Sequence, residues 1–332
     1  MPRATGPGAT PLNPDQSHDV YLHTAMLMGT VVTIQVVGHA ADQQHALARR
    51  ECVGRALEWF RRVEACCTRF DAQSEAMQLT ARIGVPVPAS AMLFEAVQFA
   101  LAVAEESGGA FDPTIGYSME MRGFDREYST GRIVQTALEP GISVSYRDVR
   151  LDSDQKTITL VRPLILDLGA VAKGLAIDMA ARELRAFEDY AIDAGGDVYV
   201  AGHSPNGAPW SVGIRHPRRD DELIDSLRVS NVAVCTSGDY ERKNSGSGHH
   251  ILDPRTGVSA DAVASVTVVA PTAMAADALA TAAFVLGPVD GIRLLERQGV
   301  DGLMLSPTLE RYATRGMGSA CTQRDGPAAS GS

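Results

Sequence analysis

Two oxygen-bearing side chains, Asp277 and Thr281, interrupt an apolar segment at 271–287. The rest of that segment is almost entirely apolar or small, so we expect a helix that is buried on most sides. Asp277 and Thr281 stand four residues apart and therefore share one face of that helix. The segment holds no Lys or Arg, and a carboxylate buried without a partner is strongly unfavourable.

A carboxylate and a hydroxyl one helical turn apart suit a hard cation such as Mg²⁺, which prefers oxygen ligands. The alternative is structural: Asp277 pairs with a distant Arg, and the Thr281 hydroxyl bonds back to the carbonyl group of residue 277. Both ends of the predicted helix are marked in the sequence. Thr272 is a typical N-cap, while Gly287 followed by Pro288 is a typical stop.

Lys173 lies close to the start of another predicted helix. The strand at 164–166 runs through residues 167–174, including Gly169, into a helix that extends to about residue 187. Free backbone N–H groups and a Lys at a helix start favour an anionic ligand, although a solvated Lys fits the pattern equally well. The chain has neither the dinucleotide fingerprint GxGxxG nor the P-loop GxxxxGK[ST].

His249 and His250 are adjacent on a predicted extended segment. Neighbouring side chains on such a segment point to opposite sides, so the two cannot easily bind one metal ion. A neutral imidazole near pH 7 is suited to accept a proton, and a solvent-facing His is the alternative.

Strands and helices alternate along the rest of the chain and must position these groups. Residues 20–37 are rich in β-forming residues and are broken at Met28-Gly29-Thr30, where Gly29 favours a bulge or a close approach to a ligand. An amphipathic helix is predicted over 40–67, with Leu47, Leu57, Phe60 and Val63 in the core. Further helices are predicted at 90–106 and from 288, and strands at 142–168, 190–200, 210–214, 227–234, 263–269 and 301–305.

Composition indicates a globular protein with a sizeable core. The chain has 332 residues, of which 45% are hydrophobic and 21% charged. Its net charge of −10, with no basic cluster, argues against nucleic acid or an anionic membrane as a partner. The five cysteines are odd in number and include no CxxC pair, which favours free thiols.

The two ends of the chain are low in apolar residues. We expect residues 1–18 to be a disordered leader, 19–313 to be a single domain and 314–332 to be a disordered tail. The first 18 residues contain no apolar core of a signal peptide, and no run looks long enough to span a membrane. A cytoplasmic location without membrane insertion is therefore expected.

A series of short motifs, in this order, resembles the ApbE family of flavin transferases, the FAD:protein FMN transferases. The motifs extend from about residue 28 to residue 305. They are Met28-Gly29-Thr30, Phe70-Asp71-x-x-Ser74-Glu75, Gly109 to Gly116, Asp167 to Gly174, Ala194-Gly195-Gly196-Asp197, Thr236 to Tyr240, His250 to Gly257 and the Asp277/Thr281 helix.

The resemblance implies an α+β fold of two related α/β halves, with mixed or antiparallel sheets and FAD bound between the halves. It implies Mg²⁺ ligands at the Asp277 and Thr281 side chains and at the Ala170 and Ala280 carbonyl groups. His250 corresponds to a histidine that prepares the acceptor hydroxyl. The positions that would line the FAD pocket are Met28, Phe70, Ala110, Phe111, Asp112, Asp167, Lys173 and Ile251.

The implied reaction transfers the FMN moiety of FAD to a Thr or Ser hydroxyl of a target flavoprotein and releases AMP. A metal ion would neutralise the diphosphate oxygens, and a base would activate the weak hydroxyl nucleophile. Two alternatives stay open: an FAD pyrophosphatase, which uses water as the acceptor, and a non-catalytic FAD-binding protein.

Two positions depart from the family pattern. Thr80 stands where members usually carry Asn, which leaves open the balance between transfer and hydrolysis. Met121-Arg122-Gly123-Phe124 replaces a Leu-Trp-Gly-Phe pattern and affects the expected choice of acceptor. Many members are exported lipoproteins; without such a leader, the expected target is a cytoplasmic flavoprotein or the cytoplasmic side of a membrane complex.

Overall fold

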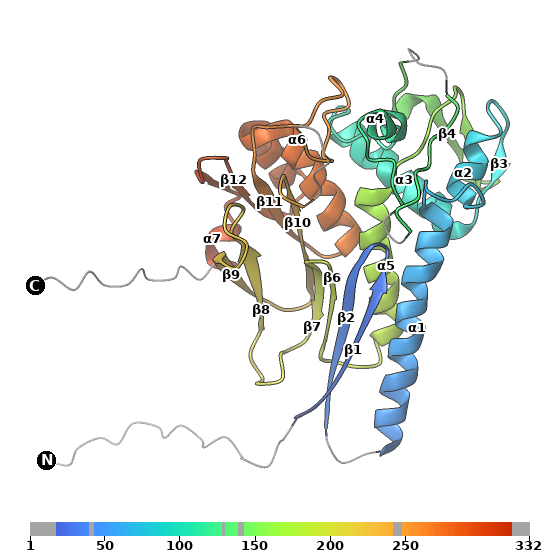
Figure 1. Cartoon of the computed structure of the whole chain (residues 1–332). Helices are drawn as coiled ribbons and strands as arrows, with labels where there is room; N and C mark the ends of the chain where they lie inside the picture. Colours follow the sequence, from blue (N-terminus) through green and yellow to red (C-terminus); the bar gives the residue numbers. More distant parts are fainter. Residues whose placement is uncertain (1–17, 40–42, 128–129, 139–142, 242–247, 321–332) are drawn as a thin grey trace, which may run out of the picture.

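The computed structural model describes residues 18–39, 43–127, 130–138, 143–241 and 248–320. Its main feature is an eight-stranded antiparallel sheet in the order β1-β2-β6-β7-β10-β11-β12-β13 (Figure 1). The strands are β1 (His18–Leu27), β2 (Thr30–His39), β6 (Tyr190–Ala194), β7 (Asp197–Ala201), β10 (Val232–Gly238), β11 (Ser265–Ala270), β12 (Asp301–Leu305) and β13 (Arg311–Ala313). The expected α+β class with antiparallel sheets is confirmed.

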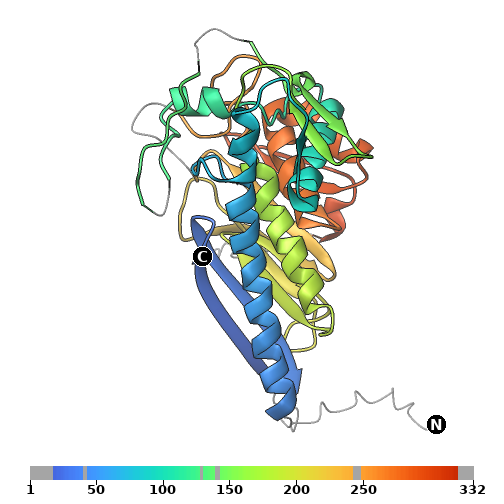
Figure 2. The same ribbon diagram turned by 90° about the vertical axis from the view of Figure 1, so that its right-hand side faces the viewer.

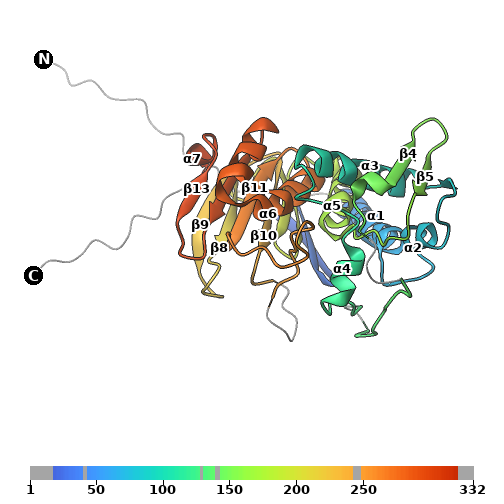
Figure 3. The same cartoon turned by 90° about the horizontal axis from the view of Figure 1, so that it is seen from above.

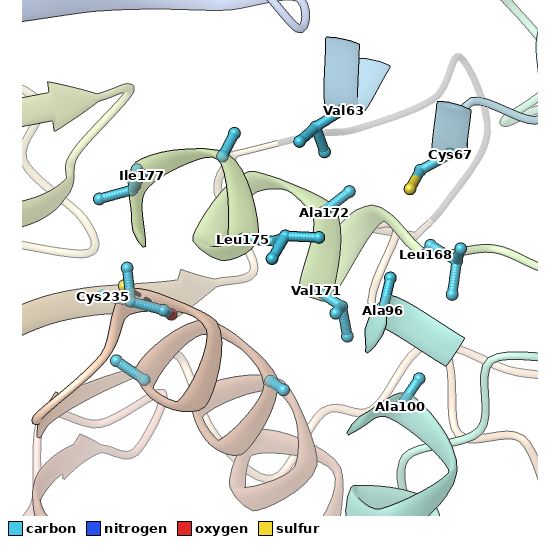
Figure 4. Packing of buried hydrophobic residues seen from close by; sticks show 14 of the residues in the cluster. Val63, Cys67, Ala96, Ala100, Leu168, Val171, Ala172, Leu175, Ile177 and Cys235 are labelled. Carbon is cyan, nitrogen blue, oxygen red and sulfur yellow. Dashed lines mark hydrogen bonds between the residues drawn. The ribbon is translucent and has the colours of Figure 1, made fainter. Parts of the chain in front are cut away.

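One face of this sheet is covered by helices. These are α1 (Gln43–Cys67), α5 (Gly169–Leu184) and α6 (Ala273–Arg297), and α3 (Ala91–Glu106) packs against these three helices. Helices α1 and α5 lie side by side along the sheet (Figure 2). Figure 4 shows α5 at the centre of the core, where its apolar side chains meet residues of α1, α3 and β10.

The opposite face carries a smaller core under the hairpin of β8 (Trp210–Arg215) and β9 (Leu223–Val229). Strand β10 shows why two cores form. Ala233 and Cys235 belong to the main core, while Val234 belongs to the smaller one. Side chains alternate along a strand, so a strand buried on both faces is apolar throughout.

A second, three-stranded sheet has the order β3-β5-β4, formed by β3 (Val87–Pro88), β5 (Thr157–Leu160) and β4 (Val149–Asp152). Near it are α2 (Glu75–Thr80), α4 (Gly116–Met121) and the short 3₁₀ helix Tyr146–Asp148. Figure 3 shows β4, β5 and α2 at the opposite end of the molecule from β13 and α7 (Met317–Ala320).

Helix α1 confirms three of its four predicted core residues. Leu57, Phe60 and Val63 are buried, whereas Leu47 is 57% exposed, so that prediction was wrong. The inward position in this part of the helix is held by Arg49, which forms an ion pair with Asp19 of β1. Leu47 lies two residues from Arg49 and therefore faces nearly the opposite way.

Met28 and Gly29 form a tight turn rather than the bulge that the sequence suggested. Leu27 pairs with Thr30 across them, and both turn residues have a positive φ, 51° for Met28 and 72° for Gly29. This geometry matches a two-residue hairpin turn whose twist fits the flanking strands. The glycine thus closes the β1–β2 hairpin.

The termini of the domain differ from the expectation. Strand β1 already begins at His18, and the predicted tail from 314 is ordered through α7. Met317 is buried in the smaller core, and the Thr314 hydroxyl donates to Asp301 Oδ1 over 2.9 Å. The burial of the Met317 side chain holds this segment against the domain, although its neighbours are low in hydrophobicity. Residues 1–17 and 321–332 lie outside the described residues.

Helix α6 contains the predicted stop as a kink, with Gly287 at φ 77° and ψ −176° before Pro288. By length and hydropathy α6 is the one described helix that could cross a membrane, so the expectation that no run is long enough was wrong. However, 61% of its apolar window is buried inside the protein, as is usual for a core helix. It packs against α5, β10 and β11.

Candidate active site

Asp277 is buried in the core of the molecule and is compensated by Lys173. The Asp277 residue is 7% exposed, and the Lys173 Nζ lies 3.5 Å from its Oδ2 atom. The structural alternative to a metal ion was an ion pair with a distant Arg; the structure places a Lys from α5 there instead. Lys173 therefore does not extend freely into solvent; its side chain is 25% exposed.

Asp197 is a second buried carboxylate in contact with the same Lys173, through its Oδ2 atom. It is the first residue of β7 and is 2% exposed. The backbone N–H of Thr236 donates to its Oδ1 atom over 3.1 Å. Sequence reasoning assigned no role to Asp197. The available signal was an acid placed directly after a Gly-Gly turn and before a buried strand.

Thr281 contacts the end of β10 from the next turn of α6. Its Oγ1 atom lies 3.1 Å from Ser237 Oγ, so the two hydroxyl groups share a hydrogen bond. Ser237 is also a residue that the sequence did not single out. Four elements thus meet at this point: the start of α5, the start of β7, the end of β10 and the first half of α6.

The crossing of α5 and α6 fixes this meeting point. A Cβ atom on Gly174 would lie 2.5 Å from Ala273 O and from the Met274 backbone, so only glycine permits the approach. Asp178 accepts hydrogen bonds from Ala273 N (2.8 Å) and Met274 N (3.0 Å), which caps α6. Thr272 accepts from Ala275 N, which confirms the predicted N-cap.

The residues around Asp277 are compatible with Mg²⁺. Asp277 Oδ2 is buried and accepts no hydrogen bond from the described residues, as a carboxylate oxygen prepared for a cation would. Among the described residues no group of three His, Cys, Asp or Glu could hold a metal ion. A site here would therefore combine one carboxylate with neutral oxygens, a set suited to a hard ion.

The two carbonyl groups expected to complete the ligand set lie on different elements. Ala170 is half-buried and is the second residue of α5. Ala280 is fully buried inside α6, where its carbonyl oxygen serves the helical hydrogen bonds.

Phe70 and Asp167 are brought together by Arg69, which sequence reasoning also missed. The Arg69 Nε donates to Asp167 Oδ2 over 2.8 Å, and its guanidinium lies 4.2 Å from the centre of the Phe70 ring. Arg69 also contacts the carbonyl oxygen of Phe124, and it is only 5% exposed. Asp167 in turn accepts from Gly169 N over 2.9 Å, so it holds the loop that enters α5.

Asp112 uses its carboxylate to brace the loop 110–116. Its Oδ1 atom accepts from Thr114 N (2.9 Å) and Thr114 Oγ1 (2.7 Å), and its Oδ2 atom accepts from Tyr146 N (2.9 Å). Burial raises the pKa of Asp112, while these hydrogen bonds oppose the rise. Its neighbours Ala110 and Phe111 are buried. In this structure Asp112 therefore shapes the loop from within.

The two adjacent histidines have different environments, as the sequence predicted for an extended segment. His249 is buried; its Nε2 atom lies 2.7 Å from Ala260 O, and its Nδ1 atom accepts from Ile251 N over 3.2 Å. Both ring nitrogens of His249 are thus engaged in structure. His250 is half-buried, which leaves it as the candidate base.

The remaining predicted positions belong to separate contacts. Met28 N donates to Glu64 Oε2 over 3.2 Å, which ties the β1–β2 turn to α1. Ile251 is buried in the main core. Thr80 Oγ1 donates to Leu164 O over 3.1 Å, a bond that the amide of an Asn could also make. The strand predicted at 164–166 is absent: Ile165 forms only an isolated bridge with Ile115, and Thr80 supports the extended segment that leads to Asp167.

Comparison with known proteins gives a family match over most of the chain. The profile described as the ApbE family matches residues 28–304, which includes every motif considered above. A curated FAD:protein FMN transferase of Treponema pallidum is 35% identical over 267 residues, which is 72% of each chain. One of Klebsiella pneumoniae is 31% identical over 302 residues, 86% of this chain and 89% of the relative.

Solved structures agree with this result. The ApbE protein of Thermotoga maritima superposes with a TM-score of 0.79 at 30% identity and covers 92% of this chain and 100% of its own. The flavin transferase ApbE of Vibrio cholerae has a TM-score of 0.77 at 25% identity, with coverage of 91% and 99%.

Proposed function

This chain belongs to the ApbE family and, by homology, is an FAD:protein FMN transferase; we propose that it acts with Mg²⁺ on a Thr or Ser hydroxyl of a target flavoprotein. The observation that carries the metal part of this proposal is that Asp277 and Thr281 lie one helical turn apart on α6. Asp277 presents a buried oxygen without a hydrogen-bond donor among the described residues, one helical turn from a second oxygen ligand.

Asp277 and Thr281 would hold Mg²⁺ with their side chains, and Ala170 and Ala280 with their carbonyl groups. When bound, Mg²⁺ would neutralise diphosphate oxygens and the charge on the departing AMP. Lys173 brings a positive charge to the same end of α5, where the diphosphate would lie. Phe70, Met28, Ala110 to Asp112, Asp167 and Ile251 are the residues that would surround FAD.

His250 would take the proton of the acceptor hydroxyl. The acceptor oxygen then forms a bond to the FMN phosphorus, the bond from that phosphorus to the AMP oxygen breaks, and AMP leaves. The proton passes from His250 to solvent. A base that removes a proton in the transition state contributes about 10²- to 10⁴-fold to the rate.

The test is an incubation of FAD and Mg²⁺ with the protein, with and without a candidate acceptor, followed by chromatography and in-gel flavin fluorescence. We expect AMP release only with the acceptor, together with fluorescence on the acceptor band. Asp277→Ala and His250→Ala should each reduce both signals at least about 100-fold. Asp290→Ala is the matched control, because the Asp290 side chain is 65% exposed and lies on the same helix.

AMP and free FMN without an acceptor would instead identify an FAD pyrophosphatase. FAD that stays intact with every acceptor, while it remains bound through the addition of Mg²⁺, would identify a binding protein. Full activity of Asp277→Ala would contradict the proposed metal site.

A further inference from the structure

Two buried carboxylates share one ammonium group at the candidate site. Lys173 contacts Asp197 Oδ2 and lies 3.5 Å from Asp277 Oδ2. A charge-assisted hydrogen bond is usually about 2.7 to 2.9 Å long, so the Asp277 oxygen lies beyond direct bonding. The ammonium is therefore assigned to Asp197, and Asp277 receives only its longer-range attraction.

Asp197 cannot readily follow a movement of Lys173. It begins β7 directly after Gly195 and Gly196, which have positive φ values of 66° and 95° and close the β6–β7 turn. A Cβ atom on Gly195 would lie 2.2 Å from Thr30 Oγ1, so the turn is packed against β2. Asp197 Oδ1 is also held by Thr236 N. The carboxylate is a fixed anchor.

A metal ion and the Lys173 ammonium compete for the same oxygen. Both are cations, and Asp277 Oδ2 accepts no hydrogen bond from the described residues. If Lys173 were released from Asp197, its flexible side chain would reach Asp277 and form a buried ion pair. A metal ion would then have to displace an ammonium group before it could bind.

We propose that Asp197 is a positioning residue that holds the Lys173 ammonium away from Asp277 and so keeps the Asp277 carboxylate available to a divalent cation. The inference rests on the proposed function, because it takes Asp277 to be the metal ligand. In this arrangement Asp197 supports metal binding without being a ligand, and this role explains why two buried carboxylates lie beside one Lys.

The competition makes a specific prediction for Asp197→Asn. Asparagine keeps the size of the side chain and an oxygen that can accept from Thr236 N, but it loses the charge that retains Lys173. We expect the Kd for Mg²⁺ to increase at least 10-fold. In the Lys173→Met background the same substitution should change the Kd less than 3-fold, since no ammonium is left to compete.

The test is a double-mutant cycle on the full chain, in which Mg²⁺ alone is titrated by calorimetry without FAD. The four proteins are the wild type, Asp197→Asn, Lys173→Met and the double variant, and thermal unfolding verifies that each is folded. Asp193→Asn is the matched control. It removes the same charge from an exposed position of the same β6–β7 hairpin, and its Kd should stay within 2-fold of the wild type.

Each outcome decides between distinct conclusions. An Asp197→Asn protein that binds Mg²⁺ like the wild type overturns the inference. An equal loss of affinity in both backgrounds also overturns it, because Asp197 then acts as a ligand or through its charge alone. Failure of the wild type to bind Mg²⁺ removes the proposed metal site itself, and this result is distinguishable because it involves no variant.

Discussion

Individual side chains at the candidate site were partly predictable. Asp277 and Thr281 stood out because polar residues in an apolar helix need a partner. The groups found beside them, the Lys173 ammonium and the Ser237 hydroxyl, come from other elements, far from them in the sequence. No local pattern specifies such contacts, because they depend on how α5 and β10 pack against α6. Asp197 and Arg69 were missed for the same reason.

Arg69 shows what a buried cation contributes at this scale. Its side chain is 5% exposed and pairs with Asp167, which is 19% exposed. Arg69→Met would leave the Asp167 carboxylate largely buried without its cation, so we expect a loss of about 3 kcal/mol in the free energy of unfolding. Urea unfolding measures this loss.

The matched control is Arg293→Met. Arg293 pairs with Asp290 on α6, but the two side chains are 68% and 65% exposed. Exposed pairs contribute little, so we expect a change within about 0.5 kcal/mol. Equal losses for the two variants would show that burial does not decide the strength of these ion pairs.

At the scale of elements, the sequence indicated where helices lie but not how closely they approach. The apolar periodicity and the caps located α6 and its Gly287 kink. The close crossing of α5 over the start of α6 depends on Gly174, which looks like any other helical glycine in the sequence. A glycine shows its packing role only when its neighbour in space is known.

Gly174→Ala should separate the two helices. The new methyl group would lie 2.5 Å from the backbone of Ala273 and Met274, so we expect a loss of about 1 to 3 kcal/mol in the free energy of unfolding and weaker Mg²⁺ binding. Gly54→Ala in α1 is the control. Its new methyl group would meet nothing within 4 Å, so we expect a gain of about 0.5 to 1 kcal/mol. Denaturant unfolding of both variants tests the pair, and a destabilised Gly54→Ala protein would contradict the propensity argument.

Asp178 makes the same α5–α6 contact sensitive to pH. Burial raises the pKa of Asp178 to about 6 from its usual value of 3.8, although two backbone N–H groups of α6 oppose the rise. The folded state therefore holds this proton more tightly than the unfolded state. The contribution of Asp178 to stability is greatest below about pH 4 and declines as the pH rises through 6.

We expect Asp178→Asn to be less stable than the wild type at pH 5, because one backbone N–H of α6 loses its acceptor. The difference in the free energy of unfolding between the two proteins should narrow by about 1 kcal/mol from pH 5 to pH 7.5. The wild type loses stability as Asp178 ionises, whereas the variant has no carboxyl group at this position. Urea unfolding at both pH values measures this difference. Parallel stability profiles would rule out titration of Asp178 in this range.

For the whole molecule, the family resemblance implied the α+β class, and the composition indicated a sizeable core, but neither indicated the sheet. The β-rich runs located several strands, although the strand predicted at 227–234 is divided between β9 and β10. The order β1-β2-β6-β7-β10-β11-β12-β13 joins strands distant in the chain. The smaller core was also unforeseen, because Trp210, Leu227 and Met317 come from separate segments that meet only on the finished sheet. The tail was predicted to start at 314 because the burial of Met317 in this smaller core was not foreseen.

The position of β2 within the sheet has a consequence for how the protein is made. β2 pairs with β1 through a tight turn, but its other neighbour, β6, follows about 150 residues later, with Val36 opposite Tyr190. At a synthesis rate of about 5 to 20 residues per second, the ribosome needs roughly 8 to 30 s to produce that partner. During this interval the emerging hairpin presents an open strand edge and the apolar side chains of Val32, Ile34 and Val36. Newly made chains are thus exposed to mispairing with one another, and a holding chaperone that covers this hairpin would increase the yield of folded protein.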